Sequence, residues 1–271
     1  MSGHEPATDP GTTTWHWEPD GPERGTAALL HGVAASAATW WRIGAELASR
    51  GWLVTALDLP GHGAMPAPDR PLDLDMLVAG VVDRLPRPLH LLAGHSLGAI
   101  VALAVVARDP GAARALVLED PPGPATADPQ QVADGIAADT QTVRSDRELL
   151  VRRERDANPR WLPQDVEYSV DGIAELHAPA VVAGLRGPLR WDPAELLASV
   201  DVPVLVVAAP DGPGSFTDDA GSALRGRDRA AVRALVPTDR FVVLDGRHCL
   251  HRDLPFEWLD VVTAFADSAR R

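Results

Sequence analysis

The chain has 271 residues, of which 45% are hydrophobic and 23% are charged. This length and composition are typical of a soluble globular protein with one large core, and they exclude a fibrous or intrinsically disordered chain. The formal net charge of −13 disfavours a nucleic-acid-binding surface, which needs clustered positive charge, and it also disfavours binding to anionic membranes. We therefore expect neither nucleic acid nor a membrane as a partner.

Cysteine use and the N-terminal segment bear on the cellular compartment. Cys249 is the only cysteine, so the chain forms no intramolecular disulfide and no cysteine-based zinc site. Residues 1–25 lack the cationic start and apolar run of a secretory signal, and the longest apolar run after Ser96 is too short to cross a bilayer. These features predict a cytoplasmic protein.

Short apolar segments bounded by Gly, Pro or Asp alternate with longer helical segments along the chain. This rhythm predicts an α/β fold with a mostly parallel central sheet and helices on both faces. Residues 12–17 alternate like an edge strand, and the dozen residues at the N-terminus are predicted to be loose. Buried strands are predicted at residues 27–30, 53–57, 89–93, 115–118, 204–208 and 241–244.

The rhythm is interrupted between residues 121 and 200, where three prolines open a stretch that contains no convincing strand. We interpret this stretch as a helical cap inserted into a core made of residues 1–120 and 201–271, the whole being a single domain. Within the cap, residues 143–158 are predicted to form a solvated helix with a narrow apolar stripe.

The segment Gly94-His95-Ser96-Leu97-Gly98 matches the pattern G-x-S-x-G, and it lies between a predicted strand and a predicted helix. A serine on such a sharp turn needs neighbours without bulky side chains, so that the strained backbone forms and Oγ projects outward. The free N–H groups at a helix start also favour a nearby oxyanion, and Leu97 N–H would be one donor. The alternative interpretation is a glycine-rich turn whose serine only caps the helix.

Two further motifs occur in the same order as in a known family. His31-Gly32-Val33 follows a predicted strand and leads to Trp40, and residues 58–63 form a D-x-x-G-x-G-like turn after the next strand. With the serine motif, they make the chain resemble the α/β-hydrolase family along nearly its whole length. The resemblance implies a serine hydrolase fold with Val33 N–H as the second oxyanion donor. Residues 58–63 we interpret as structural, with His62 a neighbour of the pocket.

A serine hydroxyl becomes an effective nucleophile only when a base accepts its proton, and nine histidines compete for that role. His248 follows the last predicted strand and resembles the family's C-terminal catalytic histidine, while His251 resembles the less critical second histidine. Arg247 departs from the small residue that the family usually has there, and it would alter access to the site. The alternative is that His248 is only a surface-loop histidine.

The third catalytic member should be a carboxylate that orients the imidazole and stabilises its charged form. Asp211, just beyond the strand at 204–208, occupies the position where many family members place this acid, although Pro210-Asp211-Gly212 is also a good turn sequence. The alternative is Glu119 or Asp120 at the end of the preceding strand, with Asp120 favoured of the two. Asp245 fits better as part of a turn.

The remaining candidates concern the pocket. We expect His31, Trp40, His95 and Trp161 to contact the substrate, with Trp41 and Trp191 as further wall candidates, although core packing is the commoner role of tryptophan. The sequence contains no H-E-x-x-H spacing and no phosphate-binding glycine loop. No cofactor, metal or nucleotide is therefore implied.

These residues predict acyl transfer on a small or medium organic molecule by a monomer or homodimer. His248 deprotonates Ser96, Val33 and Leu97 hold the oxyanion, and water cleaves the acyl-enzyme. An ester, lactone or thioester is the expected substrate. A carbon–carbon bond hydrolase, a cofactor-free haloperoxidase and a small-ligand receptor with the same fold remain alternatives, because one scaffold carries many activities.

Overall fold

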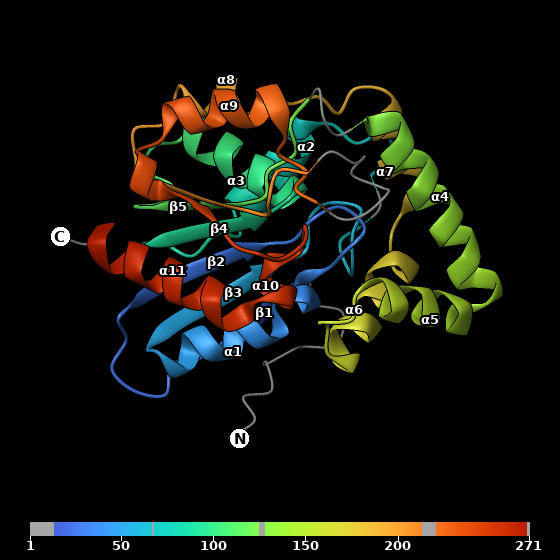
Figure 1. Ribbon diagram of the computed structural model, residues 1–271, viewed down its shortest axis with the longest axis horizontal. Coiled ribbons are helices and arrows are strands. Elements are labelled where there is room, and N and C mark those ends of the chain that lie inside the picture. The colour runs from blue at the N-terminus through green and yellow to red at the C-terminus, as the bar shows by residue number, and fades with distance from the viewer. Residues whose placement is uncertain (1–13, 67, 125–127, 213–220, 270–271) are drawn as a thin grey trace.

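A computed structural model describes residues 14–66, 68–124, 128–212 and 221–269, and its central element is one seven-stranded sheet (Figure 1). The strand order is β1-β3-β2-β4-β5-β6-β7, in which β1 pairs antiparallel with β3 and all other neighbours are parallel. The strands are β1 (Thr14–Trp17), β2 (Gly25–Leu30), β3 (Trp52–Leu57), β4 (Leu91–His95), β5 (Leu116–Glu119), β6 (Val204–Ala208) and β7 (Phe241–Val243).

The sequence predicted all of these strands, with no end shifted by more than two residues. The edge strand expected at 12–17 is β1, although residues 12 and 13 lie outside the described part of the chain, as does the predicted loose N-terminal dozen. The expectation of a mostly parallel α/β sheet is confirmed.

Helices cover both faces of the sheet, and the side chains of β2 show how the two cores divide. Ala28 and Leu30 belong to one apolar cluster and Ala27 and Leu29 to the other, because consecutive strand residues point to opposite faces. The first face is covered by α2 (Leu74–Val82), α3 (Leu97–Arg108), α8 (Pro193–Leu197) and α9 (Gly226–Leu235), and the second by α1 (Trp41–Ser49) and α11 (Pro255–Ala269).

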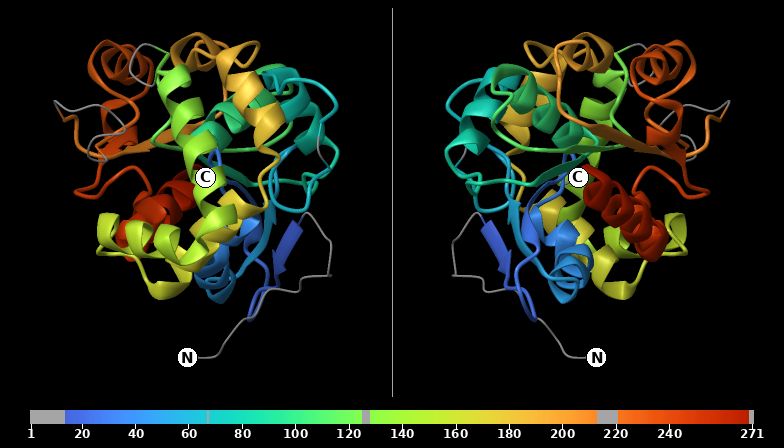
Figure 2. Two further views of the ribbon diagram at one scale, coloured as in Figure 1. Left: turned by 90° about the vertical axis from the view of Figure 1, so that its right-hand side faces the viewer. Right: turned by 90° about the vertical axis from the view of Figure 1, so that its left-hand side faces the viewer.

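Between β5 and β6 the described residues form helices and no strand. Four of them, α4 (Pro129–Ser145), α5 (Arg147–Ala157), α6 (Pro163–Ala174) and α7 (Ala178–Arg186), lie beyond the carboxyl ends of the strands, and Figure 2 shows the same helices from the side. α4, α5 and α6 pack on one another around their own small apolar cluster, which includes Leu150 and Val170. The last helix, α8, instead packs against α3 and α9, so the chain has rejoined the core before residue 200.

The helix predicted over residues 143–158, with a narrow apolar stripe, is confirmed from Arg147 to Ala157, where α5 buries only Leu150 and Val151, but residues 143–145 belong to α4. The chain breaks at Asp146, which ends α4 and begins α5, and the Asp146 side chain accepts a hydrogen bond of 2.9 Å from Leu149 N. The first N–H groups of a helix have no acceptor within the helix, and the side chain of an N-cap residue such as Asp146 accepts from one of them. The sequence signal for the break was therefore a capping residue inside a charged, otherwise helical stretch.

None of the helices in the described part of the chain combines the length and the apolar character that crossing a bilayer requires.

Candidate active site

The site forms where β4 and β5 end side by side. The two strands are parallel neighbours with His95 opposite Glu119, so the next residues, Ser96 and Asp120, emerge together at the carboxyl edge of the sheet. Ser96 N donates to Glu119 O at 2.9 Å, and Asp120 N donates to Val207 O of β6 at 2.8 Å. In parallel α/β sheets, ligands bind at this edge.

Ser96 lies on the sharp turn that the G-x-S-x-G pattern predicted. Its φ of 51° and ψ of −118° are unusual for a residue with a side chain and are of the kind that costs about 1–3 kcal/mol. The flanking glycines are required because a Cβ on Gly94 would lie 2.2 Å from Gly98 O, and one on Gly98 would lie 2.3 Å from Leu30 O. Strand, turn and helix therefore pack so closely that the turn is held in its strained form.

His248 is bonded to Asp120. Its Nδ1 lies 2.6 Å from Asp120 Oδ2, with the carboxylate fully buried and the imidazole 14% exposed. The same carboxylate accepts hydrogen bonds from Ala223 N at 2.7 Å, Ala209 N at 3.3 Å and the Ser222 hydroxyl. Four donors thus surround Asp120, and a carboxylate in such surroundings is fixed in place.

Asp211 does not reach His248, which corrects the expectation that it supplies the acid. Its side chain is exposed and accepts a 3.4 Å hydrogen bond from Gly226 N. Asp211 lies three residues past the end of β6, and β6 is one strand further from Ser96 than β5 is. Asp120, in contrast, follows β5 directly and has a φ of 44°. The carboxylate weighed as the alternative is therefore the one in contact with the histidine.

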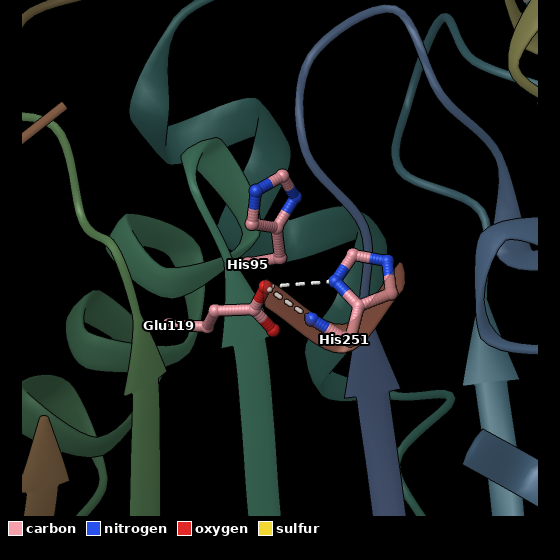
Figure 3. Close-up of side chains that lie close together, drawn as sticks. All are labelled: His95, Glu119 and His251. Carbon is pink, nitrogen blue, oxygen red and sulfur yellow. Dashed lines mark hydrogen bonds and ion pairs between the residues drawn. The ribbon is translucent and has the colours of Figure 1, made fainter. Parts of the chain in front are cut away.

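A second histidine–carboxylate pair lies beside the first, and Figure 3 shows it. Glu119 Oε1 accepts hydrogen bonds from His251 Nδ1 at 2.8 Å and from His251 N at 3.1 Å. His95 Nε2 donates to His248 O at 3.0 Å, and burial holds the pKa of His95 well below its ordinary value. The two pairs therefore tie the loop that carries His248 to the ends of β4 and β5.

His95, Glu119 and His251 also place one ligand atom each within 4.8 Å of the others, which is close enough for a shared metal ion. However, the Nδ1 proton of His251 is used in the bond to Glu119, and His95 Nε2 is used in the bond to His248 O. Binding a metal through those nitrogens would break the bonds that hold the loop. We interpret the three residues as a structural network.

The two residues expected to donate to an oxyanion are Val33 and Leu97. Leu97 is the first residue of α3, so its N–H has no intrahelical acceptor, and Val33 N–H donates no hydrogen bond within the described part of the chain. Val33 and Leu97 both line the same cavity as Ser96 and His248. Backbone N–H groups without an acceptor are the kind of donor that can stabilise an oxyanion.

This cavity has a volume of about 780 Å³, within the usual range for small-molecule sites, and it lies between the sheet edge and helices α4–α6. Of the residues expected to contact substrate, His95 and Trp161 line it, and so does Trp191. Trp41 instead donates its indole N–H to Asp165 at 2.8 Å.

His31 and Trp40 are fully buried and do not line the cavity, contrary to expectation. His31 Nδ1 donates to Gly32 O at 2.7 Å and its Nε2 accepts from Leu59 N at 2.9 Å, so it joins the ends of β2 and β3. Burial lowers the pKa of His31 to about 4, which keeps it neutral for this role. The Trp40 ring packs 4.3 Å from that of His251.

His62 does not line the cavity either. It is fully buried, and its ring lies 5.2 Å from that of His31. Its turn is held by Asp58, which accepts hydrogen bonds from Ala37 N at 2.7 Å and Ala64 N at 3.0 Å.

The helices over the cavity are fastened to the His248 loop. Trp161 donates its indole N–H to Asp253 at 3.0 Å, and Asp253 also accepts from Arg247 N at 2.6 Å. The Arg247 guanidinium donates to Ala157 O, and Arg160 donates to Asp245 O at 2.6 Å. Arg247, the departure from the family pattern, thus bridges the loop and α5.

Four charged residues in the cavity wall were not expected from the sequence, namely Asp139, Glu154, Asp156 and Arg252. Arg252 of α10 (Leu250–Asp253) is 5% exposed, and Glu154 of α5 is largely buried, with burial raising its pKa. Both lie in segments where charged residues are common. Only the fold shows that these two face the site.

Comparison with known proteins identifies the family of this chain. A model of the alpha/beta hydrolase family matches residues 28–261, and the chain belongs to that family. A pimeloyl-[acyl-carrier protein] methyl ester esterase from Methylococcus capsulatus is 31% identical over 68% of this chain and 74% of its own length. A protein of the same name from Neisseria meningitidis is 32% identical over 58% of this chain, and the match covers 63% of that relative.

Among solved structures, an E-2-(acetamidomethylene)succinate hydrolase superposes with a TM-score of 0.71 at 20% sequence identity, covering 94% of each chain. At this identity the likeness supports the shared fold.

Proposed function

We propose that this protein is a serine hydrolase that cleaves a carboxylic ester of a small or medium organic substrate through an acyl-enzyme on Ser96. The observation that carries the proposal is the meeting of a strained, cavity-lining serine with the His248–Asp120 pair at one edge of the sheet. The esterase relatives support an ester over other acyl compounds.

In the proposed mechanism, His248 Nε2 accepts the proton of Ser96 Oγ while the oxygen attacks the ester carbonyl carbon. Asp120 accepts the Nδ1 proton of His248, which fixes the tautomer that leaves Nε2 free to act as base and stabilises the imidazolium that forms. The N–H groups of Val33 and Leu97 receive the oxyanion. His248 then protonates the leaving alcohol.

The second half repeats these steps with water. His248 deprotonates a water molecule that attacks the acyl-enzyme, the same N–H groups hold the second oxyanion, and the acid is released as Ser96 recovers its proton. The fully buried carboxylate of Asp120 keeps its place through both halves because backbone donors hold it.

The test is to treat the purified protein with a fluorophosphonate probe and with 4-nitrophenyl esters of two to eight carbons. We expect covalent labelling seen by intact mass, and ester turnover, with both lost in Ser96→Ala. His248→Gln should keep the fold, as judged by its thermal melt, and lose both signals. A folded wild-type protein that neither labels nor turns over any of these esters would contradict the proposal.

A further inference from the structure

One charged side chain in the cavity wall has no role in the chemistry above. Arg252 lies four residues after His248, on the short helix α10, and it lines the cavity although only 5% of its surface is exposed. A buried charge is costly unless a partner compensates for it. The partners of this guanidinium therefore decide what it does.

Two contacts fix the orientation of the guanidinium. Arg252 Nε donates to the Thr39 hydroxyl at 2.9 Å, and the guanidinium carbon lies 4.4 Å from the centre of the Trp161 ring. Thr39 and Trp161 line the cavity as well. Stacking and a single hydrogen bond hold the plane of the group without using its two terminal nitrogens.

Those terminal nitrogens have no partner among the residues that the structure describes. Neither donates a hydrogen bond there, and no described carboxylate comes within ion-pair distance of them. The two nitrogens are also not among the fully buried polar atoms that lack a hydrogen-bond partner, so they keep some contact with the cavity. The group is thus an oriented cation with free donors at the cavity.

None of the neighbouring acidic groups in the described part of the chain forms an ion pair with this cation. Glu154 is close enough for Arg252 to lower its pKa, but burial outweighs this and raises that pKa, and its Oε2 accepts from Ser169 at 3.1 Å. Asp139 is paired with Arg153 at 3.2 Å, and Asp156 is exposed.

We propose that the terminal nitrogens of Arg252 bind a carboxylate of the substrate, so that the preferred substrates are esters that carry a second, free carboxylate group. The planar fork of an arginine matches the two oxygens of a carboxylate, which favours that anion over a neutral group. This inference rests on the proposed function, because its catalytic test needs an active hydrolase. The binding test below does not require catalysis.

The catalytic test compares two esters of equal chain length, mono-4-nitrophenyl adipate and 4-nitrophenyl hexanoate. We expect the wild type to prefer the adipate, and Arg252→Met to lower kcat/KM for it by about 10- to 100-fold, because charge-assisted hydrogen bonds are lost. The hexanoate should change less than about threefold. Arg252→Lys, which keeps the charge and loses the fork, should recover part of the adipate rate, and Arg155→Met, at an exposed position of α5, is the matched control.

The binding test measures adipate binding to Ser96→Ala by calorimetry. We expect binding that disappears in Ser96→Ala/Arg252→Met and persists in Ser96→Ala/Arg155→Met. Equal losses on both esters in Arg252→Met would assign Arg252 to packing and overturn the inference, as would a wild type without preference for the adipate. Adipate binding without turnover of any ester would instead contradict the proposed function and leave the anion site standing.

Discussion

Replacing Asp120 by Asn tests which carboxylate serves His248. Two hydrogen-bond donors contact each oxygen of the Asp120 carboxylate. Whichever oxygen an asparagine replaces with its NH2 group, that group would therefore face other donors. The NH2 group is accommodated more easily at the Oδ1 position, because the Ser222 hydroxyl there can donate instead to Leu224 O, which lies 2.9 Å from Ser222 Oγ. The amide oxygen then stays toward His248, and the charge that stabilises the imidazolium is lost.

The expected effect follows from that geometry. A hydrogen bond to a charged group contributes about 1.5–3 kcal/mol, which at the upper end corresponds to a loss of about 100-fold in kcat/KM. An amide turned the other way would impose the wrong tautomer on His248 and cost about 10⁴-fold. We therefore expect a loss of at least about 10-fold in Asp120→Asn, rising to about 10⁴-fold where the amide imposes the wrong tautomer.

The assay is the initial rate of 4-nitrophenyl butyrate hydrolysis, with a thermal melt of each variant to confirm folding. Asp211→Asn is the matched control, because Asp211 is exposed and, among the described residues, accepts one long hydrogen bond, from Gly226 N. A surface change of this kind should alter the rate by no more than about twofold. The assignment would be refuted by a 100-fold loss in Asp211→Asn together with a near-normal rate in Asp120→Asn.

Three further predictions concern stability and reactivity. Burial lowers the pKa of His31 to about 4 and that of His62 to about 3, from 6.5. The unfolded chain therefore binds protons first, and the free energy of unfolding, constant above pH 6.5 as far as these two groups are concerned, falls as the pH decreases toward 4. The slope should reach about 1.4 kcal/mol per pH unit for each histidine, and urea unfolding at pH 7, 6 and 5 would measure it, a flat profile being the contrary result. Burial raises the pKa of the half-buried Cys249 thiol, so iodoacetamide at pH 8 should modify it more slowly in the folded protein than after unfolding, which intact mass would show; equal rates in the two states would contradict this. Gly98→Ala should destabilise the fold by about 1–3 kcal/mol or more, since its Cβ would lie 2.3 Å from Leu30 O, and an unchanged denaturation midpoint would argue against the close packing at the turn.

The sheet was predictable from the sequence because each buried strand is a short apolar run with turn residues at its ends. β6 was predicted with both ends correct. The strand–turn–helix around Ser96 was predicted because glycines at 94 and 98, placed between an apolar run and a helical run, suit a sharp turn and little else. Local pattern and fold agree at these places, so the pattern alone was sufficient.

The acid and the pocket walls were harder because they depend on which strand ends lie next to each other. Asp120 and Asp211 both follow strands, and nothing in their local sequence says which one meets His248. His31 precedes an oxyanion residue and still points into the core, where Leu59 N occupies its Nε2. Nothing in the sequence around Arg252 indicated that it lines the cavity, because its position depends on the packing of α10 against Thr39 and Trp161.

The hydrogen bonds of Glu119 and Asp120 have a consequence for how new specificities arise. These neighbouring residues hold both histidines of one loop, while the walls that face away from the sheet edge come largely from α4–α6. Most of the wall that would face a substrate is therefore encoded apart from the proposed catalytic residues, with Arg252 of α10 as the exception. Mutations accumulating in α4 and α6 can diversify the accepted compounds without removing the contacts that fasten the His248 loop, so libraries restricted to residues 129–145 and 163–174 should yield altered preferences at little loss of turnover.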